Sequence, residues 1–271
     1  MEDLIVILAV LALSGALAGF LSGLMGIGGG IVMIPILYYV FGLIEAPEAY
    51  LMHLSVATSL GIIIPTTFFS FRAHQKRGAV DFEIAKTWIP WMAVGAIFGT
   101  MVAVDVNSEA LVLFFAVMAA LMGLKLILPL DNKVMTKKMP ERVVSSALGL
   151  AIGTASSMMG IGGATFSVPT MVLFNIPIHR AVGTAAFLGF FIAIFATIGF
   201  VVAGWNVPGL PAYSFGFVSL IGVLVVAPAS SLMAPFGVAV SHKLPRRQLS
   251  IVFGLFLIAA AGRMAYPLLG I

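Results

Sequence analysis

Two short glycine-rich stretches hold the residues whose types and spacing best suit the binding of an anion. The first spans residues 25–30 (Met-Gly-Ile-Gly-Gly-Gly) and the second residues 159–164 (Met-Gly-Ile-Gly-Gly-Ala). Glycine allows the backbone to leave a helix and to approach another group closely. A helix that starts after such a break offers free N–H groups and the positive end of its dipole, and both attract an anion. We therefore expect a helix break and an anion-binding site at the two stretches.

The two stretches belong to an internal repeat. They lie 134 residues apart, and 9 of the 21 residues from position 15 to 35 recur in the second copy. The identities include a proline after each stretch, Pro35 and Pro169, and a serine before it, Ser22 and Ser156. Paired discontinuous helices are typical of the binding sites of transporters. The duplication therefore favours a substrate site between the two copies.

The alternative is that these glycines only allow helices to pack closely, as small residues do in membranes. The same register pairs Gly15-xxx-Gly19 with Gly149-xxx-Gly153. We interpret these two motifs as packing faces, because they precede the breaks and carry no polar group.

Hydroxyl groups near the breaks could solvate an oxyanion without adding charge, and methionines could line the cavity as adaptable apolar walls. The alternative for each hydroxyl is a bond to a carbonyl of its own helix or to a neighbouring helix. Ser157, Ser167 and Thr170 add hydroxyls in the second copy only. The predicted substrate-binding residues are Ser22, Met25, Gly28, Gly29, Gly30, Thr58, Ser156, Met159, Gly162, Gly163, Thr165 and Thr184.

Two histidines occupy matching positions of the repeat, His53 and His179, and a threonine follows each by five residues. Histidine is the side chain that titrates near neutral pH. No Asp or Glu lies deep in an apolar segment, so we do not expect a carboxylate proton relay. Both histidines are candidates for proton coupling or gating, and the alternative is that they cap helix ends.

The composition predicts a polytopic α-helical membrane protein. Of 271 residues, 61% are hydrophobic and 9% charged, and the mean hydropathy is +1.16; long continuous apolar runs exclude a β-barrel. The chain has no cysteine, and no metal-binding motif is present. We expect a small anion and the lipid bilayer as partners, with no nucleic acid, metal or cofactor, and a homo-oligomer is compatible with the sequence.

The apolar segments divide into two sets of five. They fall at 4–25, 31–43, 51–71, 86–104 and 110–128, and at 143–158, 165–176, 181–203, 215–238 and 249–269. The second segment of each set is too short to span a bilayer, so each half is expected to be a glycine-broken helix pair, possibly re-entrant, plus three transmembrane helices. The predicted domains are an N-terminal repeat (1–130), a cytoplasmic linker (131–142) and a C-terminal repeat (143–271).

The basic residues predict the orientation. Cytoplasmic loops collect Lys and Arg, and one orientation places 13 of the 14 basic residues inside, with Arg263 as the exception. Both termini then lie outside the plasma membrane of a bacterium or archaeon. The acidic start, Glu2-Asp3, favours a mature span over a signal peptide. An odd number of crossings in each half makes the two repeats inverted, as in many secondary transporters.

The paired glycine motifs, the HxxVAT segment that begins at His53 and the HRAVGT segment that begins at His179 resemble the TauE/SafE family of sulfite exporters and related permeases. The basic linker fits as well, and the resemblance covers essentially the whole chain. It implies a plasma-membrane carrier without a cofactor that moves sulfite, sulfoacetate or similar sulfur-containing anions, often outward. Ala164 replaces the glycine of the first copy, so the two motifs need not contribute equally.

Other functions fit the sequence less well. An alternating-access exporter is expected, with a passive anion channel or a carrier of non-sulfur organic anions as alternatives. A channel usually shows charged rings or filter carbonyls. An intramembrane hydrolase would need a serine with a base in reach, and an active site rarely needs both copies of such a pair. We therefore expect no enzymatic activity.

The orientation can be tested because the chain has no cysteine of its own. Cysteines introduced at Asn132 and Asn107 should react with a membrane-impermeant thiol reagent from opposite sides, because the basic linker is expected inside. Reaction of both from the same side would contradict the orientation and, with it, the inversion of the repeats.

Overall fold

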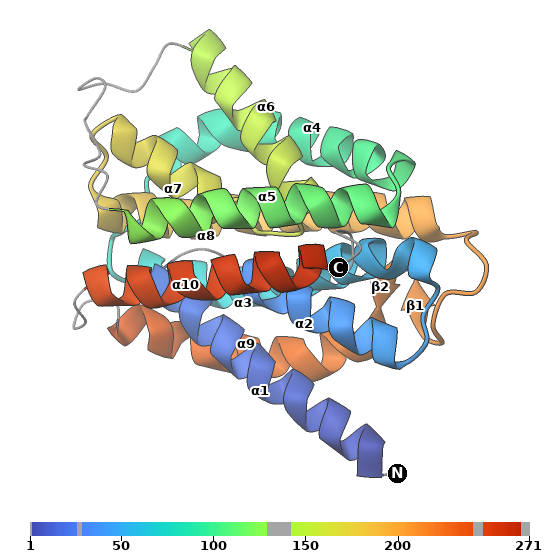
Figure 1. Cartoon of the computed structure of the whole chain (residues 1–271). Coiled ribbons are helices and arrows are strands. Elements are labelled where there is room, and N and C mark those ends of the chain that lie inside the picture. Colours follow the sequence, from blue (N-terminus) through green and yellow to red (C-terminus); the bar gives the residue numbers. More distant parts are fainter. Residues whose placement is uncertain (1, 26–28, 129–141, 241–245, 267–271) are drawn as a thin grey trace.

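The computed structural model describes residues 2–25, 29–128, 142–240 and 246–266 (Figure 1). Within these ranges the chain forms ten α-helices, one short 3-10 helix and one small hairpin. The elements are α1 Glu2–Met25, α2 Gly30–Leu43, η1 Glu48–Tyr50, α3 Leu51–Gln75, α4 Phe82–Asp105, α5 Ser108–Ile127, α6 Arg142–Met159, α7 Ala164–Leu173, α8 Ile178–Gly204, β1 Ser214–Phe215, β2 Val218–Ser219, α9 Leu220–Val240 and α10 Arg246–Ala265.

Among the described residues, five helical segments are long and apolar enough to cross a membrane. They are Glu48–Gln75, Phe82–Asp105, Ser108–Ile127, Ile178–Gly204 and Leu220–Val240. Large apolar side chains remain exposed along them, for example Val94, Phe98 and Met101 on α4. Such a surface is suited to lipid and not to water. The prediction of a mainly helical, multi-pass membrane protein is confirmed.

The second helix after each break is short. α2 has 14 residues and α7 has 10, which at about 1.5 Å per residue cover roughly 21 and 15 Å. A bilayer core is about 30 Å thick, so neither helix spans it alone. Each contains the proline that follows its glycine stretch, Pro35 or Pro169.

The helices pack in matching pairs. α1 crosses α9 at one edge of the bundle and α4 crosses α6 at the opposite edge, with α3, α5, α8 and α10 between them (Figure 1). α3 also packs on α8, and α5 on α10. A Cβ added at Gly19 would lie 2.0 Å from the carbonyl oxygen of Ser230, and one at Gly153 would lie 2.3 Å from that of Met92. The predicted packing faces on α1 and α6 are therefore confirmed.

The structure differs from the expected segments at two helix ends. The apolar run 215–238 was expected as one helix, but its first residues form the hairpin β1–β2, in which Ser214 pairs with Ser219, and α9 begins at Leu220. Gly216 turns this hairpin with a φ of 53° and lies against the backbone of Val201. α7 ends at Leu173, before the expected residue 176, and Asn175 follows it with a φ of 62°. A left-handed residue cannot continue a right-handed helix.

The close crossing of α1 and α9 is testable with Gly19→Ala. The added methyl would lie 2.0 Å from the Ser230 oxygen, and overpacking of this kind costs about 1–3 kcal/mol. The purified protein should therefore unfold at a lower temperature. Gly262→Ala in α10 is the control, because no described atom lies within 4 Å of its added carbon and alanine favours the helix. Equal midpoints for the two variants would contradict the crossing.

Candidate functional site

Each glycine stretch ends in a left-handed glycine that starts a new helix. Gly29 caps α2 with a φ of 68°, and Gly163 caps α7 with a φ of 73°. Gly160, which ends α6, has a φ of 66°. Only glycine adopts this conformation without strain. Because a glycine cap has no side chain, the first N–H groups of α2 and α7 have no side-chain acceptor at their caps.

The two breaks meet inside the protein. A Cβ on Gly30, the first residue of α2, would lie 2.4 Å from the carbonyl oxygen of Gly160. The hydroxyl of Ser59 on α3 donates a hydrogen bond of 2.9 Å to the same oxygen. All three residues are buried. The start of α2 therefore lies directly against the end of α6, although the two segments are far apart in the sequence.

The two predicted serines lie beside the breaks of their own halves. The Cβ of Ser22 lies 3.4 Å from the place of a Cβ on Gly29, and the Oγ of Ser156 lies 3.5 Å from that on Gly163. Both serines are buried, with 1% and 0% of their surface exposed. The repeat thus places a serine against each left-handed glycine.

Three buried hydroxyls around the second break have no hydrogen-bond partner among the described residues. They belong to Ser156, Thr165 and Ser167, which are at most 8% exposed. A buried hydroxyl without a partner is costly, and such groups in a native structure need an explanation. A bound ligand with acceptor oxygens would supply the missing partner.

The charge of the interior is set by dipoles and not by ionised side chains. Within the part of the chain that the structure describes, the buried polar side chains are serines, threonines and two histidines, with no Asp, Glu, Lys or Arg. The N-termini of α2 and α7 each carry roughly half a positive charge. The region around the breaks can therefore attract an anion without a buried cation.

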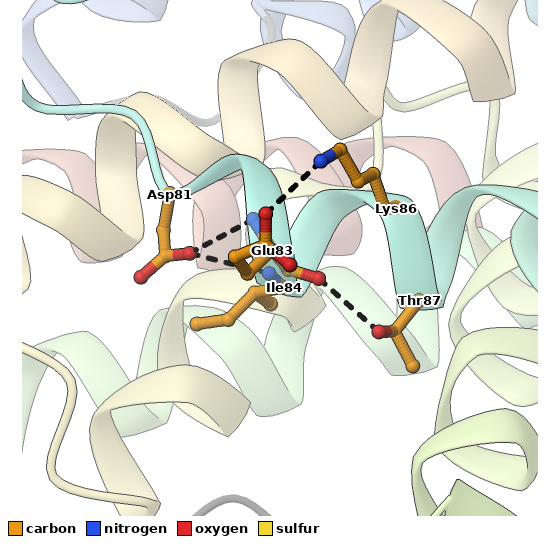
Figure 2. Close-up of polar contacts among 5 residues, drawn as sticks. All are labelled: Asp81, Glu83, Ile84, Lys86 and Thr87. Atoms are coloured by element: carbon orange, nitrogen blue, oxygen red, sulfur yellow. Dashed lines mark hydrogen bonds and ion pairs between the residues drawn. The ribbon is translucent and has the colours of Figure 1, made fainter.

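Thr58 and Thr184 each hold the start of another helix. Thr184 accepts a hydrogen bond of 2.8 Å from the backbone N–H of Asp81, and Thr58 accepts one of 3.0 Å from that of Ser219. Asp81 caps α4 through the N–H groups of Glu83 and Ile84 (Figure 2), and Ser219 accepts from the N–H of Gly222 in α9. This geometry favours a structural role beside the site for both threonines.

The two candidate histidines have different surroundings. His53 is 2% exposed, and its Nε2 lies 3.0 Å from the carbonyl oxygen of Ala103 and 3.1 Å from that of Val106. Two carbonyl acceptors place the proton on Nε2, so His53 joins the start of α3 to the end of α4. His179 is exposed in the first turn of α8. Among the described residues, the hydrogen bonds of the His53 ring join it to the end of α4 and not to a glycine break.

The other predicted residues are placed as follows. Met159 is fully buried at the end of α6, and the carbonyl of Gly162 lies 2.1 Å from the place of a Cβ on Gly189. Met25 ends α1, but its side chain lies outside the described residues, as does Gly28. Within the described chain, no group of three or more His, Asp or Glu residues is arranged to hold a metal.

Sequence reasoning missed Ser59 and Gly189, which bring α3 and α8 against the second break. The sequence did contain a signal for Ser59, because Ser55 and Ser59 lie four residues apart in a strongly apolar helix. Residues at this spacing share one face of a helix. Gly189 had no local signal, since its importance comes from the carbonyl of another segment.

The role of Thr184 can be tested with Thr184→Val, which removes the acceptor for the Asp81 N–H. A lost hydrogen bond that leaves a donor unpaired costs about 1–3 kcal/mol, so the melting temperature should fall while the KM for the predicted anionic substrate stays unchanged. Thr170→Val is the control, because that hydroxyl bonds only the Phe166 carbonyl of its own helix. A raised KM without loss of stability would return Thr184 to the substrate site.

The chain is similar over most of its length to known membrane transporters. The family model "Sulfite exporter TauE/SafE" matches residues 11–264. A "Probable membrane transporter protein" of Haemophilus influenzae is 34% identical over 252 residues, covering 93% of this chain and 96% of that protein. The "Probable membrane transporter protein YunE" of Bacillus subtilis is 24% identical, covering 95% and 97%.

A relative from Xylella fastidiosa, also called "Probable membrane transporter protein", is 26% identical over 92% of this chain. A search of the solved structures found no match. The family is one of transporters and not of enzymes, in agreement with the resemblance of the glycine motifs. From residue 11 to residue 264, this chain belongs to the TauE/SafE sulfite exporter family of membrane transporters.

Proposed function

We propose that this protein is a secondary transporter in the plasma membrane that exports small sulfur-containing anions of the sulfite or sulfonate type. The family description names sulfite export. The region around the breaks suits such a substrate, because a small oxyanion has several acceptor oxygens and needs donors on several sides. Hydroxyl groups and helix N-termini supply donors without an ionised partner.

The observation that carries this proposal is the meeting of the two breaks next to unpartnered hydroxyls. Gly30 touches the Gly160 carbonyl, and the hydroxyls of Ser156 and Thr165 are buried without a partner among the described residues. In our proposal one anion binds here, held by Ser22, Ser156, Thr165 and the N–H groups after Gly29 and Gly163. Met159 forms an apolar wall, and Met25, Gly28 and Gly162 remain proposed members of the same site.

We further propose that residues 1–130 and 143–271 are inverted repeats joined by the linker 131–142. The packing supports this, because the most extensive contacts between the halves have counterparts with the roles exchanged. α1 packs on α9 as α6 packs on α4, and α3 packs on α9 as α8 packs on α4. The bonds of Thr58 to Ser219 and of Thr184 to Asp81 form a matching pair. Two halves related in this way can rock about a central site, which is how many such carriers alternate access.

The proposal predicts an unusual result for Ser156→Ala. Its hydroxyl has no described partner, so removing it should not destabilise the empty protein and can stabilise it. In the bound state the same hydroxyl would donate to an anion. A bond of this kind contributes about 1.5–3 kcal/mol, so the KM in proteoliposomes should rise by about 10- to 100-fold.

Ser157→Ala is the matched control, because the hydroxyl of Ser157 donates to the Thr154 carbonyl in α6. This substitution should leave the KM near the wild-type value. The anion for the assay is chosen by thermal-shift screening against sulfite, sulfonates, sulfate and carboxylates. An unchanged KM in Ser156→Ala would remove this serine from the site. Stabilisation by carboxylates alone would replace sulfur-containing anions with other organic anions as the substrate.

A further inference from the structure

A cavity lies at the end of α3, away from the glycine breaks. Its volume is about 580 Å³, and its lining includes Phe68, Phe69, Arg72, Lys76, Arg77 and Pro235. Arg72 follows Ser59 at the breaks by thirteen positions of α3, which is roughly 20 Å along the helix axis. The cavity therefore lies in a different part of the molecule. What it binds can be inferred without knowing which anion is transported.

The cationic half of this cavity has no acidic partner within the described part of the chain. The ion pairs within the described residues join Lys86 to Glu83 and Arg180 to Asp81, so neither Arg72, Lys76 nor Arg77 is paired with a carboxylate there. Arg77 donates to the carbonyl of Ala73, and the guanidinium of Arg72 lies 5.7 Å from the centre of the Phe68 ring. The three cations can therefore bind an anionic group from outside the protein.

The other half of the cavity is apolar and belongs to the membrane-spanning part of the helices. Phe68 and Phe69 are 38% and 47% exposed and precede Arg72 by about one turn of α3. Across the cavity stands Pro235 of α9, whose neighbours Leu232 and Phe236 are also exposed. A small hydrophilic anion would gain nothing from these walls, whereas a molecule with a hydrocarbon part would cover them.

We propose that this cavity binds an anionic phospholipid. The phosphate group contacts Arg72, Lys76 and Arg77, and the start of an acyl chain lies on Phe68 and Phe69. Arginine is suited to this task because its guanidinium forms paired hydrogen bonds with phosphate oxygens. The order of groups along α3, apolar and then cationic, matches the order of chain and headgroup at a membrane surface. The lipid would also bridge α3 and α9.

The test compares Arg72→Gln/Lys76→Gln with Lys86→Gln in full-length protein. Phosphatidylglycerol bound per protein is counted by native mass spectrometry after reconstitution in phosphatidylcholine with phosphatidylglycerol. Each cation near a membrane surface is worth about fivefold in affinity for an anionic lipid, so the double variant should bind roughly 25-fold more weakly. Lys86→Gln should bind as wild type does, because Lys86 is already paired with Glu83 (Figure 2). Equal losses in both variants would overturn the site.

A second arm separates a lipid from a free anion. Short-chain phosphatidylglycerol should raise the melting temperature of the wild type, and Phe69→Ser should reduce that shift. Soluble anions should not raise the melting temperature through Arg72 and Lys76. Any shift that they cause should therefore be the same in Arg72→Gln/Lys76→Gln as in the wild type; the anions tested are glycerol 3-phosphate, inorganic phosphate and sulfite. Inorganic phosphate or sulfite could instead raise the melting temperature as much as the lipid does, with the shift lost in Arg72→Gln/Lys76→Gln. The cavity would then be a site for soluble anions, and the lipid proposal would be wrong. If Phe69→Ser leaves the lipid shift intact, the apolar half takes no part and the proposal fails as well.

Discussion

A helix that breaks inside a membrane leaves backbone N–H and C=O groups without partners, and hydrocarbon offers none. At the second break the structure meets this constraint with contacts from helices elsewhere in the chain. The carbonyl of Gly160 receives the hydroxyl of Ser59, and the carbonyl of Gly162 lies in contact distance of Gly189 on α8. The glycines that create the breaks and the glycines that bury them are therefore parts of one arrangement.

Close packing of the outer helices follows from the same constraint. The breaks can be enclosed only if α1 and α6 approach their partners at backbone distance, since a larger separation would open the interior to lipid or water. Gly19 and Gly23 on α1 face the backbone of Ser230 and Ala234 on α9. Without a hydrophobic force between helices in lipid, such contacts supply much of the association energy. The small-residue motifs and the helix breaks are thus parts of one packing arrangement.

Local patterns in the sequence were sufficient for the helices, the breaks and the packing faces, because each has a signal within a few residues. They failed where a distant contact decides the outcome. The residues just before α9 read as the apolar start of that helix. Instead, segment 214–219 forms a hairpin, because Gly216 turns the chain against Val201. Ser59 had a local signal in its helix, but its partner could not be predicted, since Gly160 is remote in the sequence. Thr58 and Thr184 were recognised as equivalent, but their acceptor roles toward Ser219 and Asp81 depend on how the halves pack.

The differences between the two halves say as much about function as their similarity. Ile31 and Met33 of the first half stand where the second has Thr165 and Ser167, whose hydroxyls are buried without described partners. Ser59 stands where the second half has Ala185. Matching backbones give both halves a helix N-terminus, and hence a share in balancing a negative charge. In our proposal the additional hydroxyls of the second half would orient the bound anion, since hydrogen bonds, unlike a dipole field, select a direction for each oxygen. In the proposed carrier, a symmetric frame that rocks and an asymmetric set of donors that orients the substrate are therefore compatible.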